Sequence, residues 1–127
     1  MARKAIKVEG GTAVGPYSQA VASGNHLFLS GQTPIDPETG GLKAGSIQDQ
    51  TEQCFQNLFR VLEAANLTPD DVSVVQVYLT DMADFSAMNE VYEKQFTQPF
   101  PARTTIGVAA LPLDAKVEIG LTALLRN

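Results

Sequence analysis

The side chains that most often carry catalysis are scarce in this 127-residue chain, which limits the chemistry open to it. His26 is the only histidine and Cys54 the only cysteine. A zinc site built from several histidines or cysteines, and a Ser-His-Asp triad, therefore lack their parts. We expect no metal site, so any chemistry must come from carboxylates, arginine, tyrosine, hydroxyl groups and the backbone.

The elements that must position such groups alternate between strands and helices. β-branched and apolar residues gather between Gly- and Pro-rich turns, which predicts strands over 6–8, 26–30, 72–80, 103–109 and 116–125. The connection 31–41 is long and rich in turn residues, and loops of that length are often functional.

Two stretches between these strands have helical patterns. Ser46 followed by Asp49 resembles an N-cap with an acidic third position, and apolar residues then recur at helical spacing as far as Asn66. Asp84 can cap a second helix, which ends before Pro99. The apolar residues that share one face of this second helix are Phe85, Met88, Tyr92 and Phe96.

This order of elements predicts the fold class. Strand–helix–strand connections favour parallel strands and right-handed crossovers, which place both helices on the same side. We expect an α+β fold in which a single mixed β-sheet carries two helices on one face. The length is that of one domain, which we assign to residues 1–127.

The second face of this sheet has no predicted cover. Alternation along the last strand sends Val117 toward the helices and Glu118 to the bare face. Because Ile106 is assigned to the helix side by the same argument, Arg103 and Thr105 are predicted to share the bare face with Glu118. A bare face is usually covered by association, so we expect a homo-oligomer with this arginine and carboxylate near a subunit boundary.

The net charge of -5 disfavours nucleic acid as a partner, because no basic stripe is present to neutralise phosphates. Residues 1–4 carry two positive charges, but no apolar signal segment follows them, and no stretch is apolar enough to span a bilayer. A single cysteine fits a reducing compartment. We therefore expect a cytoplasmic protein that binds neither membranes nor nucleic acid.

Four ordered motifs carry a family resemblance: GPYSQA at 15–20, SGQTPIDPETG at 30–40, PART at 101–104 and KVEI at 116–119. In these motifs, and along nearly its whole length, the chain resembles the Rid (reactive intermediate deaminase, formerly YjgF) proteins. The resemblance implies a chorismate-mutase-like fold and a homotrimer with active sites in the clefts between subunits. It also implies cofactor-free hydrolysis of 2-iminobutanoate or 2-iminopropanoate, released by pyridoxal-phosphate enzymes, to 2-keto acids and ammonia.

The resemblance assigns the two principal roles to Arg103 and Glu118. Arg103 matches the arginine that binds the substrate carboxylate, a contact that suits its planar fork of N–H donors. Glu118 matches the acid that positions or activates the hydrolytic water. This role fits the chemistry, since hydration of a C=N bond needs a proton acceptor near the attacking water. Without the resemblance, each would be interpreted as a solvated or ion-paired surface residue.

Four further residues match positions at the family's site. Tyr17 matches a loop tyrosine that closes over the ligand, and Ser30 with Gly31 matches a strand end that faces the pocket. Asn89 matches a helical asparagine near the site. Three of them also have a structural interpretation: Tyr17 as a core or interface aromatic, Gly31 as a turn residue and Asn89 as part of a solvated helix face.

The sequence departs from the family at three positions. Thr105 stands where family members commonly carry cysteine; if the backbone N–H there contacts the substrate carboxylate, threonine should serve equally well. Gly120 replaces a frequent glutamate and Ala110 a frequent arginine. These two changes alter the charge at the rim of the implied site and leave the substrate preference open.

Three functions remain open from the sequence. The first is the imine deaminase, and the second is a non-catalytic trimer that senses small keto or amino acids or docks a partner protein. Arg103 together with Glu118 favours the enzyme, because a carboxylate sensor needs the arginine but not the water-handling acid. The third is a ribonuclease or translation inhibitor, which the acidic charge and the lone histidine disfavour.

Overall fold

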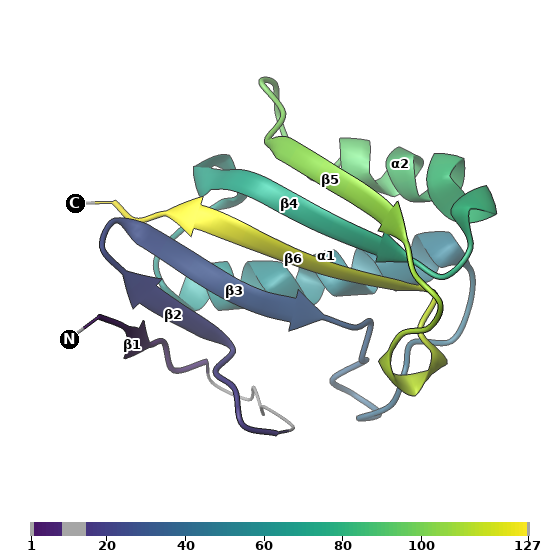
Figure 1. The fold of residues 1–127 in the computed structure, drawn as a ribbon, viewed down its shortest axis with the longest axis horizontal. Helices are drawn as coiled ribbons and strands as arrows, with labels where there is room; N and C mark the ends of the chain where they lie inside the picture. The colour runs from purple at the N-terminus through teal and green to yellow at the C-terminus, as the bar shows by residue number, and fades with distance from the viewer. Residues whose placement is uncertain (1, 9–14, 127) are drawn as a thin grey trace.

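The structure, a computed structural model, describes residues 2–8 and 15–126. Its sheet has the strand order β1-β2-β3-β6-β4-β5 (Figure 1). The strands are β1 (Lys4–Ala5), β2 (Ala20–Ser23), β3 (His26–Gln32), β4 (Val72–Leu79), β5 (Ala102–Gly107) and β6 (Val117–Leu124). The helices are α1 (Ile47–Ala64) and α2 (Phe85–Glu93), with single 3-10 turns η1 (Pro69–Asp71), η2 (Met82–Asp84) and η3 (Pro112–Asp114).

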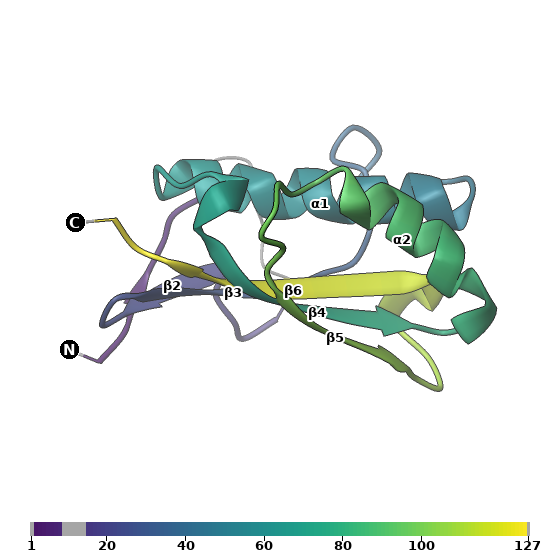
Figure 2. The ribbon, with the colours of Figure 1, turned by 90° about the horizontal axis from the view of Figure 1, so that it is seen from above.

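The sheet is mixed, and both helices lie on the same side of it. β4 and β5 pair in parallel across the α2 crossover, whereas the other strand pairs are antiparallel. Seen along the sheet, α1 and α2 form one layer and the strands form the other (Figure 2). The predicted fold class, an α+β fold with two helices on one face of a mixed sheet, is confirmed.

Helix α1 begins where the sequence predicts. The Ser46 side chain accepts a hydrogen bond from the Asp49 N–H at 3.1 Å, and the Asp49 carboxylate accepts one from the Ser46 N–H at 3.0 Å. This reciprocal capping box satisfies two N–H groups that the helix itself cannot pair. The helix ends at Ala64, just before the predicted end near Asn66, which has a left-handed φ of 60°.

The core lies between α1, α2 and the helix side of the sheet. Phe55 and Leu58 of α1 are fully buried against Val77 of β4 and Ile119 of β6, which are fully buried as well. Each such side chain contributes roughly 1.5–3 kcal/mol by leaving water. The predicted alternation of β6 is confirmed, because its odd-numbered residues 117–123 are buried beneath the helices.

The N-terminal strands differ from the prediction. β1 covers Lys4–Ala5 rather than 6–8, and the sequence analysis missed β2, whose four residues pair with β1 and β3. Four residues are too few for a clear alternation, so β2 depends on its neighbours in the sheet. In α2, Asp84 occupies the N-cap position without a capping bond, and Asp81 instead caps the preceding turn by accepting from the Ala83 N–H.

The prediction for β5 is wrong in its orientation. Arg103 lies beside Val75 and Thr105 beside Val77 in the β4–β5 ladder, and these valines are fully buried beneath the helices. Neighbouring residues of a ladder point to the same face, so Arg103 and Thr105 face α2. β5 is an edge strand whose helix side is only partly covered, so polar residues can occupy it while Ile106, 45% exposed, faces the bare side.

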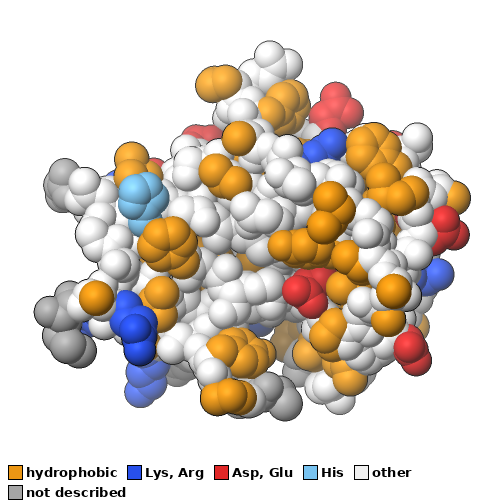
Figure 3. Space-filling model, in the orientation of Figure 1, with side chains coloured by type: hydrophobic (Ala, Val, Ile, Leu, Met, Phe, Trp, Pro, Cys, Tyr) orange, Lys and Arg blue, Asp and Glu red, His pale blue; other side chains and the backbone are white. Residues whose placement is uncertain are grey.

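The bare face of the sheet is the one seen in Figure 3. Hydrophobic side chains form several separate patches across it. Phe28 on β3, 44% exposed, and Ile106 on β5 belong to this face, and no described helix covers it. Exposed apolar groups of this size on a sheet are typical of a surface that another chain covers.

Candidate functional site

The carboxylate of Glu118 lies on the bare face against the backbone of Gly31. The β3–β6 ladder shifts register between Leu29 and Gln32, so Ser30 and Gly31 form an irregular segment of β3. A Cβ atom added to Gly31 would lie 2.5 Å from Oε2 of Glu118. Glycine therefore provides the space in which this carboxylate lies.

Ser30 connects this segment to the loop that carries Tyr17. Its hydroxyl donates to the Ser18 carbonyl at 2.6 Å, and its N–H donates to the Gln19 carbonyl at 2.9 Å. Because the Ser30 proton is already used, this hydroxyl can offer a ligand only its oxygen as an acceptor. Tyr17, in the same loop as Ser18, is 48% exposed. We call Tyr17, Ser30, Gly31 and Glu118 the glutamate half.

Burial alters the protonation chemistry around Glu118. The half-buried carboxyl is partly desolvated, which raises its pKa above the ordinary value for glutamate. On the helix side of the sheet, Cys54 is fully buried, and its thiol donates to the Gln32 carbonyl at 3.3 Å. Desolvation, with a smaller contribution from the charge of Glu118, strongly raises the pKa of Cys54. Cys54 therefore stays protonated and is part of the core.

Arg103 projects from β5 onto one stripe of α2. Its Nη1 donates to Oδ1 of Asn89 at 2.7 Å, and its guanidinium carbon lies 4.6 Å from the ring centroid of Tyr92 and 5.6 Å from that of Phe85. Among the residues that the structure describes, Arg103 forms no salt bridge. Most of its N–H donors thus remain available for an external carboxylate.

A hollow of about 340 Å³ opens beside this guanidinium. Its walls come from the end of α2 and from the segment that leads into β5. The lining residues are Asn89, Tyr92, Glu93, Phe100, Pro101 and Arg103. The lining has one cation, Arg103, and one acid, Glu93, beside three aromatic or apolar side chains, so the cation can bind a small carboxylate that has an apolar substituent.

Thr105 lies two residues further along β5 on the same side as Arg103. Its Oγ1 is buried and has no hydrogen-bond partner among the described residues. The Val108 N–H donates to the Leu79 carbonyl of β4. Because N–H groups alternate along a strand, the Thr105 N–H points away from β4, toward the free edge of the sheet. We call Asn89, Arg103 and Thr105 the arginine half.

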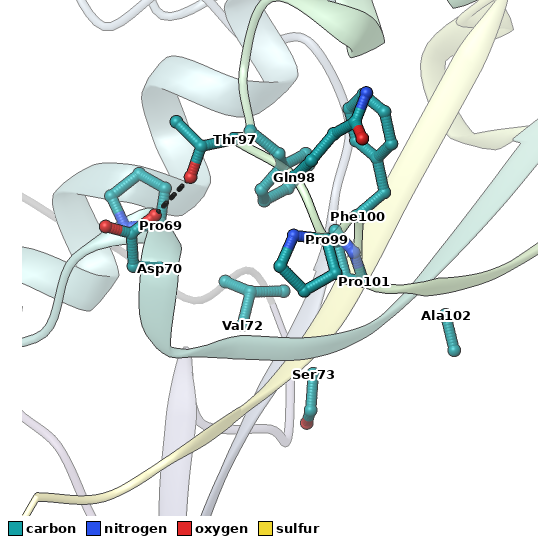
Figure 4. A pocket seen from close by; sticks show the side chains of 11 residues that line it. Pro69, Asp70, Val72, Ser73, Thr97, Gln98, Pro99, Phe100, Pro101 and Ala102 are labelled. Carbon is teal, nitrogen blue, oxygen red and sulfur yellow. Dashed lines mark hydrogen bonds between the residues drawn. The ribbon is translucent and has the colours of Figure 1, made fainter.

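A larger hollow, of about 430 Å³, shares Phe100 and Pro101 with the first (Figure 4). Its one charged lining residue is Asp70, whose carboxylate accepts a hydrogen bond from Thr97 at 3.0 Å. None of the predicted site residues lines it. The smaller hollow also has an acid in its lining, Glu93, but only the smaller hollow has a cation, Arg103, that can bind a carboxylate, so it is the better candidate.

The two halves of the site are separated within one chain. Glu118 is on β6 and faces the bare side, Arg103 is on β5 and faces α2, and β4 lies between these strands. Standard strand spacings place their Cα atoms about 14 Å apart. A small imino acid cannot bridge the two side chains through the sheet.

Tyr92 lines the hollow beside Arg103, but the sequence analysis did not single it out as a candidate site residue. It was assigned only to the apolar face of its helix, and it is indeed 6% exposed. The spacing of Phe85, Asn89 and Tyr92, at i, i+4 and i+7, could have shown that all three form one stripe toward β5.

No helix in residues 2–8 and 15–126 is both long and apolar enough to cross a membrane. The same residues contain no group of three or more His, Cys, Asp or Glu side chains placed to hold a metal ion.

Comparisons with known proteins cover nearly the whole chain. A family model described as Endoribonuclease L-PSP matches residues 9–125. A RutC family protein of Pyrococcus horikoshii is 51% identical over 106 residues, which make up 84% of each chain. A protein of Dermatophagoides farinae named 2-iminobutanoate/2-iminopropanoate deaminase is 44% identical over 106 residues, 84% of this chain and 83% of that one.

Comparison of the structures shows similarity to the same family. A crystal structure of a Rid family protein from Yersinia pestis superposes with a TM-score of 0.93 at 38% identity, over 98% of this chain and all of the other. Similarity at this identity and coverage reflects common descent as well as a common fold. The chain therefore belongs to the Rid family, whose members are matched by the model described as Endoribonuclease L-PSP.

Proposed function

We propose that this protein hydrolyses the C=N bond of small 2-imino acids, such as 2-iminobutanoate and 2-iminopropanoate, to 2-keto acids and ammonia. One observation carries the proposal: an arginine with no carboxylate partner among the described residues and a partly desolvated glutamate occupy positions that match the family motifs. The name of the Dermatophagoides farinae relative supports the same chemistry.

The proposed site is composite. Because Arg103 and Glu118 face opposite sides of one sheet, the arginine half of one subunit must meet the glutamate half of another. β5 is an edge strand, so its free edge and its hollow can approach the bare face of a second copy. We propose a closed homotrimer, in which each of three such contacts forms one site.

Substrate binding follows from the donors of the arginine half. The guanidinium holds the substrate carboxylate through the N–H groups not used by Asn89, and the free N–H of Thr105 supplies a further donor. Tyr17 covers the ligand from the glutamate half. This places the imine carbon toward Glu118 and leaves the substituent to the apolar wall of the hollow.

The reaction then needs one proton shuttle and no cofactor. The Glu118 carboxylate takes a proton from water as the water oxygen bonds to the imine carbon, and the π electrons of the C=N bond move to nitrogen. Nitrogen receives that proton, which gives a carbinolamine. Glu118 next takes the proton of the new hydroxyl and passes it to nitrogen as the C–N bond breaks, releasing ammonia and the keto acid. A raised pKa makes Glu118 a stronger base and keeps its protonated form accessible.

The ribonuclease function has weaker support. His26 lies exposed on β3 and stacks on Phe28, with ring centroids 5.7 Å apart, and it belongs to neither half. The net charge of -5 also opposes binding to a phosphate backbone. A non-catalytic carboxylate sensor is a stronger alternative than a ribonuclease, because the arginine half alone could bind the carboxylate.

A direct assay tests the proposal. 2-Iminobutanoate is generated in situ by a pyridoxal-phosphate dehydratase, and the imine is trapped with semicarbazide in the presence and absence of this protein. We expect less trapped imine and faster release of keto acid and ammonia. The Arg103→Ala/Glu118→Gln double variant is the control. No acceleration by an assembled wild-type protein would leave the sensor as the function.

A further inference from the structure

The guanidinium carbon of Arg103 lies over an aromatic ring. Of the two rings near it, Tyr92 is the closer, with 4.6 Å from the guanidinium carbon to the ring centroid against 5.6 Å for Phe85. Asn89 lies between them on α2 and accepts from Nη1 at 2.7 Å. One stripe of the helix thus contacts the guanidinium both through aromatic rings and through a hydrogen bond to one of its N–H groups.

The Tyr92 ring is itself firmly held. It is 6% exposed and packs against Phe55 and Phe96, with centroid separations of 5.7 and 5.2 Å. Phe55 is fully buried in the core beneath α1. The surface on which the exposed Arg103 rests is therefore part of the core rather than a mobile side chain.

Stacking on a ring leaves the in-plane N–H groups of an arginine free. Cation–π contact uses the flat face of the guanidinium, whereas a carboxylate binds at its edge in the same plane. We expect contact with Tyr92 to restrict the tilt of that plane and the hydrogen bond to Asn89 to restrict its rotation. An arginine on an exposed edge strand would otherwise lose much rotamer freedom when it binds a ligand.

We infer that Tyr92 is a positioning residue, whose ring holds the Arg103 guanidinium ready for the carboxylate of the substrate. The inference rests on the proposed function for the identity of the ligand, and on the described contacts for the role of the ring. The hydroxyl of Tyr92 has no partner among the described residues, so the role belongs to the ring.

Three variants separate the ring from the hydroxyl and from simple packing. Tyr92→Leu removes the ring, and Tyr92→Phe keeps it while removing the hydroxyl. Phe96→Leu is the matched control, because Phe96 belongs to the same aromatic cluster and is 8% exposed, yet it does not stack on Arg103. Loss of packing alone should affect Tyr92→Leu and Phe96→Leu alike.

Two readouts do not depend on turnover: the Kd of 2-oxobutanoate by calorimetry and the NMR resonance of the Arg103 Nε–H. For Tyr92→Leu we expect Kd to rise about fivefold to thirtyfold and the Nε–H to lose its upfield ring-current shift. Tyr92→Phe should restore the shift and bring Kd back to within about threefold of wild type. Phe96→Leu should lower Tm but leave the Kd of the folded protein within about twofold.

The outcomes distinguish this inference from the proposed function. Equal Kd values for Tyr92→Leu and Phe96→Leu, or a Tyr92→Phe variant as weak as Tyr92→Leu, would overturn the role of the ring. Absence of 2-oxobutanoate binding by wild type would overturn it as well. A wild-type protein that binds 2-oxobutanoate through a ring-shifted Arg103 but hydrolyses no imine would support the inference and remove the deaminase.

Discussion

Arg103 and Glu118 project from opposite faces of the same sheet, with strand β4 between their strands. In a single chain the two side chains cannot hold one small ligand. If both act on one imino acid, they must come from different subunits, which makes assembly a condition of activity. The predictions below test this relationship and the residues around it.

Subunit mixing tests the composite site. Arg103→Ala and Glu118→Gln should each be inactive alone, but chains mixed in equal amounts should form sites with both residues intact at about a quarter of the interfaces of a closed ring. Activity should therefore recover to about a quarter of the wild-type value. Mixing either variant with the double variant should restore none. No recovery, with mixed trimers seen by native mass spectrometry, would place both residues of a site in one chain.

Single substitutions should separate binding from proton transfer. Arg103→Lys loses the planar fork and its stacking surface, so we expect it chiefly to raise KM. Glu118→Gln keeps the shape but removes the base, and kcat should fall by about two to four orders of magnitude. Steady-state kinetics on assembled protein provides the measurement. An unchanged kcat in Glu118→Gln would exclude Glu118 from the mechanism.

The fall in kcat/KM at low pH should follow the protonation of Glu118. Burial raises the pKa of this carboxyl above its ordinary value of 4.5, and the base must be ionised. kcat/KM should therefore fall, as pH decreases, through an apparent pKa above 4.5, and this fall should be absent from the residual activity of Glu118→Gln.

The same shift predicts the effect on stability. A carboxyl with a raised folded-state pKa favours folding fully below its unfolded pKa, and this contribution is lost as pH rises through the folded pKa. At neutral pH the ionised and partly desolvated carboxylate disfavours the folded state, so Glu118→Gln should not lower Tm. A clear drop in Tm would show that the charge of Glu118 has a stabilising partner.

Gly31→Ala tests the space that Glu118 occupies. The added methyl would lie 2.5 Å from Oε2, so the end of the Glu118 side chain must move while the backbone need not. We expect kcat/KM to fall about tenfold to a hundredfold with little change in Tm. Gly41→Ala is the matched control, because its Cβ would meet only Thr39 Oγ1, at 3.9 Å, and it should keep full activity. Equal activity in the two variants would mean that Glu118 does not need this position.

Thr105 separates a backbone role from a side-chain role. If its edge-facing N–H binds the carboxylate, Thr105→Ala and Thr105→Cys should keep most of the activity, and Thr105→Pro should lose it with the trimer intact. Removing an unpaired buried hydroxyl should also cost no stability. A loss of about tenfold to a hundredfold in Thr105→Ala, partly restored in Thr105→Ser, would assign the contact to the hydroxyl.

Local patterns in the sequence were sufficient for much of the fold. The capping box of Ser46 and Asp49 defines the start of α1, because both partners lie within one helical turn. The alternation of β6 correctly predicts its buried face, because β6 is a central strand and one side of it is fully covered. The family motifs likewise single out Arg103 and Glu118 as candidate site residues.

Only the tertiary structure decided which side of the sheet each side chain faces at the edge. The alternation of β5 is equally compatible with either orientation. Its register with Val75 and Val77 of β4 shows that Arg103 and Thr105 face the helices. The stacking of Arg103 on Tyr92 likewise joins an edge strand to a helix, so no local pattern contains it. Contacts between elements depend on register and on which strand lies at the edge, and these are set when the whole sheet assembles.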